Sequence, residues 1–389
     1  MTTPIEPTTD SDPHTSRLPS TMAAVHLTGH GGLDKLEYRS DVPVPSPGTG
    51  EVLIEVGAAG INNTDINTRI GWYSKTVDGA TETGAATGFD TVADDDEASW
   101  SGTALTFPRI QGADVCGRIV SVGPQVDSNR LGQRVLVRNM LRSYVDYRPY
   151  ECWTFGSECD GGFAQFAVAP SQETHTVDSD WDDVHLAAVP CAYSTAENML
   201  HRAHVTAGQR VLVFGASGGV GMAAVQLAKR RGATVLAVSS ASKAAQVRQH
   251  GADQVIERGA DLAAEVGTQS VDVIVDVVGG TAVSANLELL RFGGKYTLAG
   301  AIGGPIAEVD LRTVYLRDLS LLGCTFQEDD VFADLIGYIE RNEVSPLVSK
   351  TYPLSAIRRA QEDFMGKTYP GKLVVVPPSA VEPSTEGDV

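Results

Sequence analysis

Residues 210–240 read RVLVFGASGGVGMAAVQLAKRRGATVLAVSS, and this stretch decides the fold of the chain. An apolar run of the kind found in buried strands leads into a glycine-rich turn over residues 215–221, and an apolar helical pattern follows. Glycines at positions 218, 219 and 221 permit a tight turn and let the backbone approach a pyrophosphate. The first turn of the helix then offers unpaired N–H groups and the positive end of its dipole to phosphates. The stretch therefore predicts a dinucleotide-binding βα turn.

The residues around this turn repeat a rhythm of strand and then helix. Helical stretches separate most of the strand-like runs, which begin at Val211, Thr234, Asp253, Val271, Lys295 and Leu319. Apolar strands that alternate with helices are typical of a parallel sheet that is covered on both faces. A glycine-rich turn alone is a weak signal, but at the head of six such segments it is specific. We therefore predict an α/β, doubly wound Rossmann domain.

The end of the second of these strands bears on the choice of cofactor. Sites that select NAD usually carry an acidic residue there, which holds the ribose 2′-hydroxyl. This chain has Ser239 and Ser240 at that place, with Lys243 just beyond. Because a carboxylate is absent and a cation is near, the site suits a 2′-phosphate, and we expect NADPH as the cofactor. The alternative is that Lys243 is an ordinary surface lysine.

The first part of the chain has a different pattern. From Met22 onward, short β-rich runs such as MAAVHL, EVLIEVGAAGI and GGFAQFAVAP are separated by proline and glycine, as in an antiparallel, barrel-like domain. After Cys324 the pattern becomes helical and then ends in GKLVVVP, a strand that can rejoin the first domain. We therefore expect a disordered tail at 1–21, a catalytic domain at 22–192, a dinucleotide-binding domain at 193–324, a return to the catalytic domain at 325–377 and a second disordered tail at 378–389.

An unusual segment interrupts the first domain at about residues 76–105. Between Lys75 and Pro108 the chain carries seven acidic residues, no basic residue and many small ones. We interpret this segment as a long surface loop inserted into the domain. A decorative loop is favoured over a substrate lid, although long loops in compact domains are often functional.

Composition excludes several classes of partner. The formal net charge is -19 and the sequence pI is near 4.8, so the surface repels nucleic acid backbones and anionic membrane headgroups. No apolar stretch approaches the length of about 18 residues that would suggest a membrane span. The cysteines are odd in number and scattered, which argues for a reducing compartment rather than a disulfide framework. We expect a cytoplasmic protein with a small-molecule electrophile as its substrate.

With these motifs in view, the chain resembles the medium-chain dehydrogenase/reductase superfamily from Met22 to Pro377. The resemblance is carried by GEVLIEVGAAGINNTDINTRIGWY, GADVCGRIVSVG, GGFAQFAVAP, the glycine-rich stretch and the closing GKLVV. It implies a GroES-like β-barrel catalytic domain made from both ends of the chain, a central Rossmann domain, and an active-site cleft between them. We also expect a homodimer that forms through the edge strand of the Rossmann domain.

Departures from the family pattern indicate the branch. Zinc alcohol dehydrogenases carry a cysteine ligand where this chain has Asn62, and His-Glu where it has Ala113 and Asp114; only Cys191 stands at a ligand position. A catalytic zinc needs three protein ligands, so we expect no metal here. The pattern is similar to the quinone oxidoreductase and enoyl-reductase branches.

This resemblance implies a set of site residues. Asn62, Asp65 and Tyr73 are expected near the nicotinamide, where Asn62 donates a hydrogen bond to the substrate oxygen and Tyr73 is a possible proton donor. Asp65 is equally well explained as a carboxylate that caps a turn. The expected cofactor contacts are Thr195, Ser217, Gly218, Gly219, Val220, Gly221, Ser239, Ser240, Lys243, Val278, Gly300 and Lys372.

Some alternatives remain open at this point. The aromatic segment 142–162 replaces the lobe that binds a structural zinc in the family, and it suits either a pocket wall with Trp153 and Cys159 facing the substrate or a plate for dimer contact. The leading function is an NADPH-dependent reductase of quinones or activated alkenes. The alternatives are a zinc-type alcohol dehydrogenase and a dinucleotide-binding sensor or structural protein without turnover.

Overall fold

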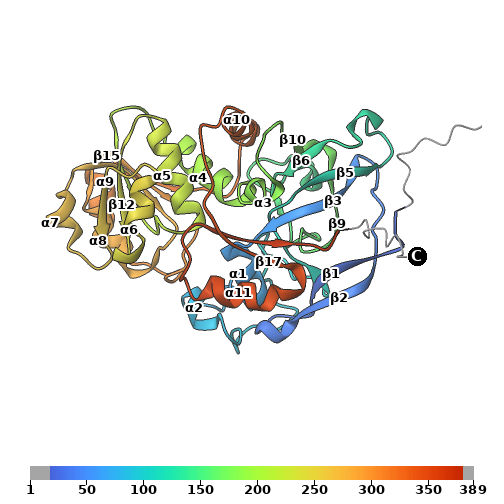
Figure 1. Ribbon diagram of the computed structural model, residues 1–389. Coiled ribbons are helices and arrows are strands. Elements are labelled where there is room, and N and C mark those ends of the chain that lie inside the picture. Colours follow the sequence, from blue (N-terminus) through green and yellow to red (C-terminus); the bar gives the residue numbers. More distant parts are fainter. Residues whose placement is uncertain (1–17, 380–389) are drawn as a thin grey trace, which may run out of the picture.

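The computed structural model describes residues 18–379, which form two domains that lie side by side (Figure 1). Most of the two predicted tails therefore lies outside the described residues. At the first boundary, Thr21 already begins strand β1 (Thr21–Leu27). At the other end, the Pro378 carbonyl accepts a hydrogen bond from Gln165 Nε2 at 3.0 Å.

The Rossmann domain is built on a sheet of six parallel strands, which confirms the predicted α/β fold class. Its strand order is β13-β12-β11-β14-β15-β16, so the sheet grows outward in both directions from the strand that leads into the glycine-rich turn. The strands are β11 (Arg210–Val213), β12 (Thr234–Ser239), β13 (Gln254–Glu257), β14 (Val271–Asp276), β15 (Leu290–Leu298) and β16 (Ser320–Gly323).

Helices cover both faces of this sheet because successive strand residues point to opposite sides. Val211 and Val213 of β11 pack into one hydrophobic cluster, whereas Leu212 packs into another on the opposite face. The first face is covered by α4 (Pro190–Arg202), α5 (Gly219–Arg230), α6 (Ala244–Gln249) and α10 (Asp329–Glu340). The second face is covered by α7 (Leu262–Val266), α8 (Val283–Leu287) and α9 (Leu311–Leu316).

The glycine-rich turn between β11 and α5 requires glycine for steric reasons. A Cβ atom at Gly221 would lie 2.2 Å from the Gly215 carbonyl oxygen, so any side chain there would push the helix away from the strand. Gly215 itself has a φ of 63°, in the left-handed region that glycine adopts without strain. The turn therefore holds the N-terminus of α5 directly above the end of β11.

The catalytic domain is formed mainly by antiparallel strands. Its largest sheet has the order β10-β6-β5-β3-β18-β17, with β9 paired to β3, and β2-β1-β4 and β7-β8 form two smaller sheets. The remaining strands of this domain are β2 (Leu36–Pro43), β3 (Glu51–Gly60), β4 (Arg109–Ile110), β5 (Cys116–Val122), β6 (Arg134–Val137), β7 (Met140–Leu141), β8 (Trp153–Thr154), β9 (Phe166–Pro170), β10 (Thr174–Thr176), β17 (Val348–Pro353) and β18 (Lys372–Val376). Its helices are α1 (Asn63–Ile70), α2 (Thr81–Gly84), α3 (Asp183–Leu186) and α11 (Ile357–Met365).

The end of the chain joins the two domains. Strand β18 pairs with β3 in antiparallel fashion, with Val374 opposite Gly60. Just before β18, the Gly371 N–H donates to the Ser217 carbonyl at 2.8 Å, and Gly218 forms a bridge with Gly371. The glycine-rich turn of the Rossmann domain is thus bonded directly to the residue that precedes β18 of the catalytic domain.

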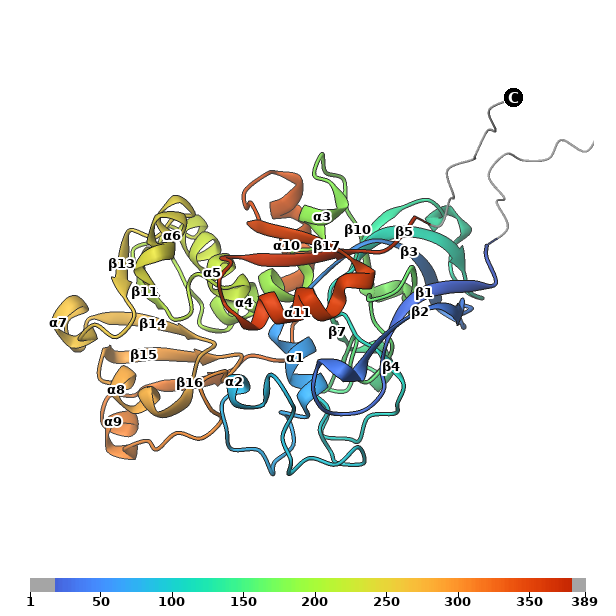
Figure 2. The same ribbon diagram turned by 60° about the horizontal axis from the view of Figure 1, so that its bottom comes forward.

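The acidic insertion is an ordered part of the surface rather than a free loop. Figure 2 shows it as long loops beside α1, with α2 near the β15 and β16 side of the Rossmann domain. The buried guanidinium of Arg69 in α1 donates to the Ala85 carbonyl of the insertion at 2.9 Å and to Gln361 of α11 at the same distance. These bonds fasten the insertion and α11 to one helix of the catalytic domain.

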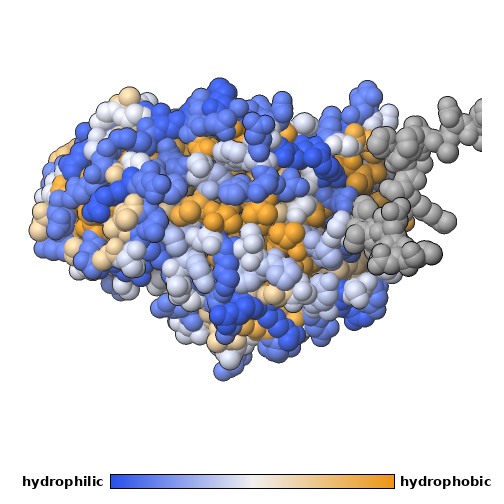
Figure 3. Space-filling model, in the orientation of Figure 1, coloured by the Kyte–Doolittle hydropathy of each residue, from blue (hydrophilic) through white to orange (hydrophobic). Residues whose placement is uncertain are grey.

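The outer surface is mainly hydrophilic on the face shown in Figure 3, where hydrophobic residues gather in a band across the middle. No helix among residues 18–379 is long and apolar enough to cross a membrane. The largest hydrophobic cluster runs through α4 and includes Ala58 and Leu136 of the catalytic domain together with Val211 and Val273 of the Rossmann sheet. The two domains therefore share one continuous core at this helix.

Candidate active site

A buried ion pair lies where the two domains meet. The Lys372 ammonium is 2.8 Å from Asp114 Oδ2, and the side chains are 3% and 0% exposed. The stem of Lys372 passes between two glycines, since a Cβ atom would lie 2.9 Å from its Cδ at Gly219 and 3.1 Å from its Cε at Gly60. The absence of side chains at these positions lets one lysine reach from the glycine-rich turn to the catalytic domain.

Each hydrogen of the Lys372 ammonium has an acceptor inside the protein. Besides Asp114, the Nζ atom donates to Asn62 Oδ1 at 2.5 Å and to the Ile61 carbonyl at 3.0 Å. An ammonium has three hydrogens to donate, so this set is complete. The resemblance implied that Lys372 contacts the cofactor, whereas here its charged end is engaged with catalytic-domain groups.

The amide of Asn62 is held in one orientation by the same cluster. Its oxygen accepts from Lys372, and its nitrogen donates to Asp114 Oδ2 at 2.8 Å and to the Gly60 carbonyl at 3.4 Å. Because lysine only donates and a carboxylate only accepts, the amide cannot be reversed. Both amide hydrogens therefore have acceptors other than the substrate oxygen that we expected Asn62 to contact.

The second oxygen of Asp114 caps a helix. Asp114 Oδ1 accepts from the backbone N–H of Cys191, in the first turn of α4, at 2.6 Å. A carboxylate at this end of a helix is stabilised by the unpaired N–H groups and by the helix dipole. Asp114 thus joins Lys372 of β18, Asn62 before α1 and the start of α4.

These residues do not fit a catalytic zinc. The positions that hold zinc ligands in the alcohol dehydrogenases of this family are here Asn62, the pair Ala113 and Asp114, and Cys191, and the Lys372 ammonium is bonded to Asn62 and Asp114. Burial raises the pKa of the Cys191 thiol, which disfavours the thiolate that a metal requires. No group of three or more His, Cys, Asp or Glu side chains suited to a metal comes together within residues 18–379.

Asp65 has the geometry of a capping carboxylate. Its oxygens accept from the backbone N–H groups of Asn62 at 2.7 Å and of Ala113 at 3.3 Å, so it ties the start of α1 to the loop that carries Asp114. Burial raises the pKa of Asp65 to about 7, and the negative charge of Asp114 adds to this rise. The arrangement matches the turn-capping alternative for this residue.

Tyr73 follows α1 and is half-buried. Its hydroxyl donates to Thr64 Oγ1 at 3.2 Å, and burial raises its pKa above the ordinary value for tyrosine. The phenol therefore stays protonated at neutral pH. Because Thr64 stands next to Asp65 in α1, this hydrogen bond places the Tyr73 hydroxyl near the residue that ties α1 to the loop of Asp114.

The structure brings the expected cofactor residues together at the carboxyl ends of the central strands. Val278 and Gly300 follow β14 and β15, and a Cβ atom at Gly215 would lie 3.4 Å from the Val278 side chain. Thr195, one turn after Cys191 in α4, interacts with the Cys191 thiol. Ser217, Gly218, Gly219, Val220 and Gly221 form the turn and the first residues of α5.

A group of cations surrounds the end of β12. The Arg258 N–H donates to the Ser239 carbonyl at 2.9 Å, and burial together with the Arg258 charge lowers the pKa of Lys243. Lys243 donates to the Lys367 carbonyl, and Lys367 donates to Asn63 Oδ1 rather than to a carboxylate. Sequence reasoning missed Arg258 and Lys367. Arg258 could have been predicted from the sequence, because it follows β13, the strand next to β12, and neighbouring parallel strands end at the same edge of a sheet.

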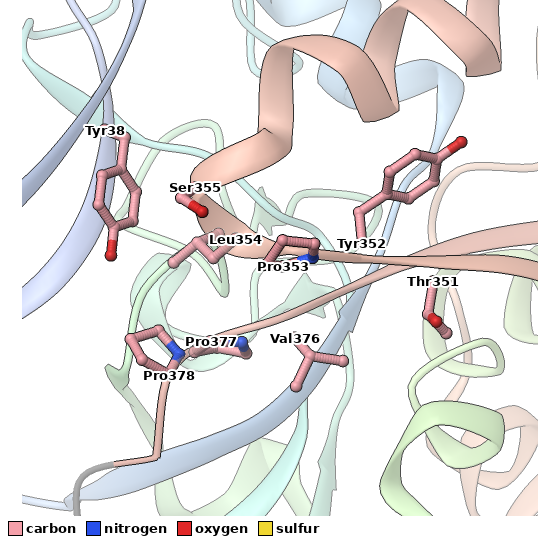
Figure 4. Close-up of a pocket in the computed structure, with 9 residues that line it drawn as sticks. All are labelled: Tyr38, Thr351, Tyr352, Pro353, Leu354, Ser355, Val376, Pro377 and Pro378. Carbon is pink, nitrogen blue, oxygen red and sulfur yellow. The ribbon is translucent and has the colours of Figure 1, made fainter. Parts of the chain in front are cut away.

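The aromatic segment 142–162 packs onto the catalytic domain. Trp153 contacts Tyr144 with 5.2 Å between ring centroids, and both Trp153 and Cys159 pack against the hydrophobic core of this domain. A pocket of about 390 Å³ lies elsewhere, where Tyr38 of β2 faces β17 and the residues after β18 (Figure 4). It contains none of the expected site residues and is separate from the candidate active site.

The buried ion pair leads to a prediction for stability. Lys372→Met leaves the Asp114 carboxylate buried without a cation, so we expect the free energy of unfolding to fall by about 3–5 kcal/mol. The double variant Lys372→Met/Asp114→Asn removes both charges and should regain at least half of this loss. Lys229→Met, which removes a surface pair with Asp253, is the control and should lose about 1 kcal/mol or less. Denaturant unfolding measures all four proteins, and a double variant no more stable than Lys372→Met would contradict the assignment.

Comparisons with known proteins agree with this architecture. The alcohol dehydrogenase GroES-like domain family matches residues 48–179, and the zinc-binding dehydrogenase family matches residues 219–341. Quinone oxidoreductase of Mus musculus is 30% identical over 91% of this chain and 98% of its own length. Acryloyl-coenzyme A reductase of Metallosphaera sedula is 26% identical over 91% of this chain and 99% of its own length.

A solved structure shows the same likeness. A protein of Sinorhizobium meliloti 1021, described as a candidate alcohol dehydrogenase, is 45% identical over 93% of this chain and 98% of its own, with a TM-score of 0.82. The predicted family is therefore confirmed, and with it an enzyme that uses a nicotinamide cofactor. The chain is an oxidoreductase that belongs to the medium-chain dehydrogenase/reductase superfamily.

Proposed function

We propose that this enzyme uses NADPH to reduce a quinone or another activated alkene or carbonyl without a catalytic metal. The observation that carries the proposal is the Lys372–Asp114–Asn62 cluster, in which a side-chain cation is bonded to residues that stand where the family carries zinc ligands. The similarity to a quinone oxidoreductase and to an acryloyl-coenzyme A reductase supports an electrophilic double bond as the group that is reduced.

Residues at the carboxyl edge of the Rossmann sheet would hold the cofactor. The turn from Ser217 to Gly221 would receive the pyrophosphate, because its backbone can approach closely and α5 presents its N-terminus there. Val278, Gly300 and Thr195 would line the path toward the catalytic domain. When bound, the cofactor supplies a hydride at C4 of its nicotinamide ring, and the protein supplies position and polarity.

Tyr73 is our candidate for the proton donor. Its raised pKa keeps the hydroxyl protonated, and rotation of the hydroxyl hydrogen away from Thr64 would direct it toward a bound substrate. Asn62 takes a different role from the one that the resemblance implied. Since its amide hydrogens are engaged, we infer that Asn62 positions the Lys372 ammonium, whose charge is balanced by Asp114, and that this polar cluster fixes the shape of the site.

An activity screen tests this proposal against its two alternatives. We expect NADPH oxidation with quinones and enones at about 1 s⁻¹ or faster, and full activity after exhaustive chelation. Enoyl thioesters and aldehydes complete the panel. Oxidation of alcohols or reduction of aldehydes that is lost on chelation would establish the zinc-type alternative instead. A protein that binds NADPH but turns over none of these electrophiles would be a sensor or structural protein.

The preference for NADPH rests on the cations around β12. The strand ends in Ser239 rather than in a carboxylate, and Lys243, Arg258 and Lys367 lie together beyond it in a chain of strongly negative charge. An anion bound between neighbouring cations attracts each of them and offsets their mutual repulsion. A 2′-phosphate on the adenosine ribose, which lies at this strand end in Rossmann sites, is an anion of the right kind.

We therefore expect NADPH to bind at least about tenfold more tightly than NADH, which corresponds to about 1.4 kcal/mol. Lys243→Ala and Arg258→Ala should each weaken NADPH binding and leave NADH binding nearly unchanged. Lys229→Ala, which removes a lysine from the far end of α5, should change neither. Calorimetry gives the dissociation constants, and equal affinities of the parent enzyme for both cofactors would refute the preference.

We further propose a homodimer that forms through β16. This strand is the edge of the Rossmann sheet, and exposed apolar side chains surround it: Phe292, Ile306, Leu311, Tyr315, Leu316 and Leu321. An unpaired edge flanked by an apolar patch favours pairing with a second copy.

Light scattering at micromolar concentration tests the dimer. We expect the mass of two chains for the parent and of one chain for Leu321→Glu, because a buried carboxylate would face its own symmetry mate. Leu131→Glu, at an exposed leucine of the catalytic domain, is the matched control and should remain a dimer. A monomeric parent would refute the interface.

A further inference from the structure

The acidic insertion brings an aromatic side chain to the rim of the candidate active site. The Trp100 ring lies 4.9 Å from the Tyr73 ring between centroids, at an interplanar angle of 42°. Trp72 also contacts Tyr73, with 5.7 Å between centroids and an interplanar angle of 82°. We call these three half-buried rings the aromatic wall. Two of them follow α1 directly, whereas the third comes from the insertion.

One hydroxyl fixes the two rings that lie nearest to the site. Thr64 Oγ1 accepts a hydrogen bond from Trp100 Nε1 at 2.6 Å and another from the Tyr73 hydroxyl at 3.2 Å. Thr64 is buried and lies in the first turn of α1, next to Asp65. Because the indole N–H of Trp100 is bonded to Thr64, the face of the indole ring is the part that remains for contact with a ligand.

The insertion is anchored on both sides of Trp100. Ser99 and Thr103 close a tight turn with a backbone bond of 3.2 Å, and the Ser101 N–H donates to Glu158 Oε1 of the aromatic segment at 2.7 Å. Nearer its start, Thr81 donates to the Ile302 carbonyl at 3.1 Å, in the loop that follows Gly300. The insertion thus bridges from the catalytic domain to the cofactor side of the Rossmann domain, which a merely decorative loop would not do.

We propose that Trp100 is a specificity-determining residue, whose indole face stacks on the planar ring of the substrate and makes the enzyme prefer polycyclic quinones to linear enones. This inference rests on the proposed reductase activity and assigns its substrate class. Indole is electron-rich on its face, and a quinone ring is flat and electron-poor, so the two attract when stacked. A linear enone has little flat surface that could stack on the aromatic wall.

The test compares two substrates and four proteins. The substrates are 9,10-phenanthrenequinone and a linear enone of similar reactivity, and the variants are Trp100→Leu, Trp100→Phe and Asp95→Ser. For Trp100→Leu we expect kcat/KM for the quinone to fall about two- to tenfold, mainly through KM, which is the size of one aromatic stacking contact. The enone should change less than about twofold. Trp100→Phe should keep most of the preference, and Asp95→Ser, an exposed position in the same insertion, should keep all of it.

The possible outcomes are distinct. An unchanged ratio of the two substrates in Trp100→Leu, or an equal loss for both, would overturn the inference, because a structural anchor would affect both alike. If the leucine variant does not fold, Trp100→Met takes its place with the same expectation. A parent enzyme that oxidises NADPH with neither substrate would refute the proposed function instead. In that case, quenching of tryptophan fluorescence by the quinone still tests the contact, and parent and Asp95→Ser should bind it more tightly than Trp100→Leu.

Discussion

The ion pair between Lys372 and Asp114 is the contact on which the site depends. A lysine and a carboxylate that are almost completely buried persist only if every hydrogen and every oxygen finds a partner, because removing charges from water is expensive. Here the partners come from Asn62, the Ile61 carbonyl and the first turn of α4. Meeting this requirement fixes the relative positions of β18, α1 and α4, which meet at the boundary between the two domains.

Lys372 and its partners also take over part of the role that zinc has in the alcohol dehydrogenases of this family. A metal ion in such a position supplies positive charge and orders the ligands around it. The ammonium of Lys372 supplies a single positive charge at one point and orders Asn62 and Asp114 through hydrogen bonds. The exchange removes a strong Lewis acid, and it suits chemistry in which the electrophile is already activated by its own conjugation.

The sequence predicted those features that local rules determine. The glycine-rich turn and the six strands follow from a spacing within 31 consecutive residues and from the rhythm around it, because backbone sterics at Gly221 act over a single turn, and the family follows from this stretch together with four other motifs. The partners of Asn62 could not be predicted in this way, since they depend on a lysine 310 positions away in the chain. Arg258 and Trp100 were missed for the same reason. Each reaches the site through the tertiary arrangement of a strand end or an inserted loop, and no residue pattern beside them specifies that destination.

The pairing of β18 with β3 also constrains how the protein is made. The N-terminal strands leave the ribosome long before β18. The Ile61 carbonyl therefore has no lysine to bond with until the chain is 311 residues longer. During synthesis the Rossmann segment can form from neighbouring residues, while the earlier sheet remains open at the C-terminal end of β3, where Ala59 and Gly60 later pair with β18. The nascent chain can therefore form its Rossmann domain before it completes its catalytic domain. The catalytic domain is complete only when β18 pairs with β3, and until then the open end of β3 is a part of the molecule that chaperones would need to shield.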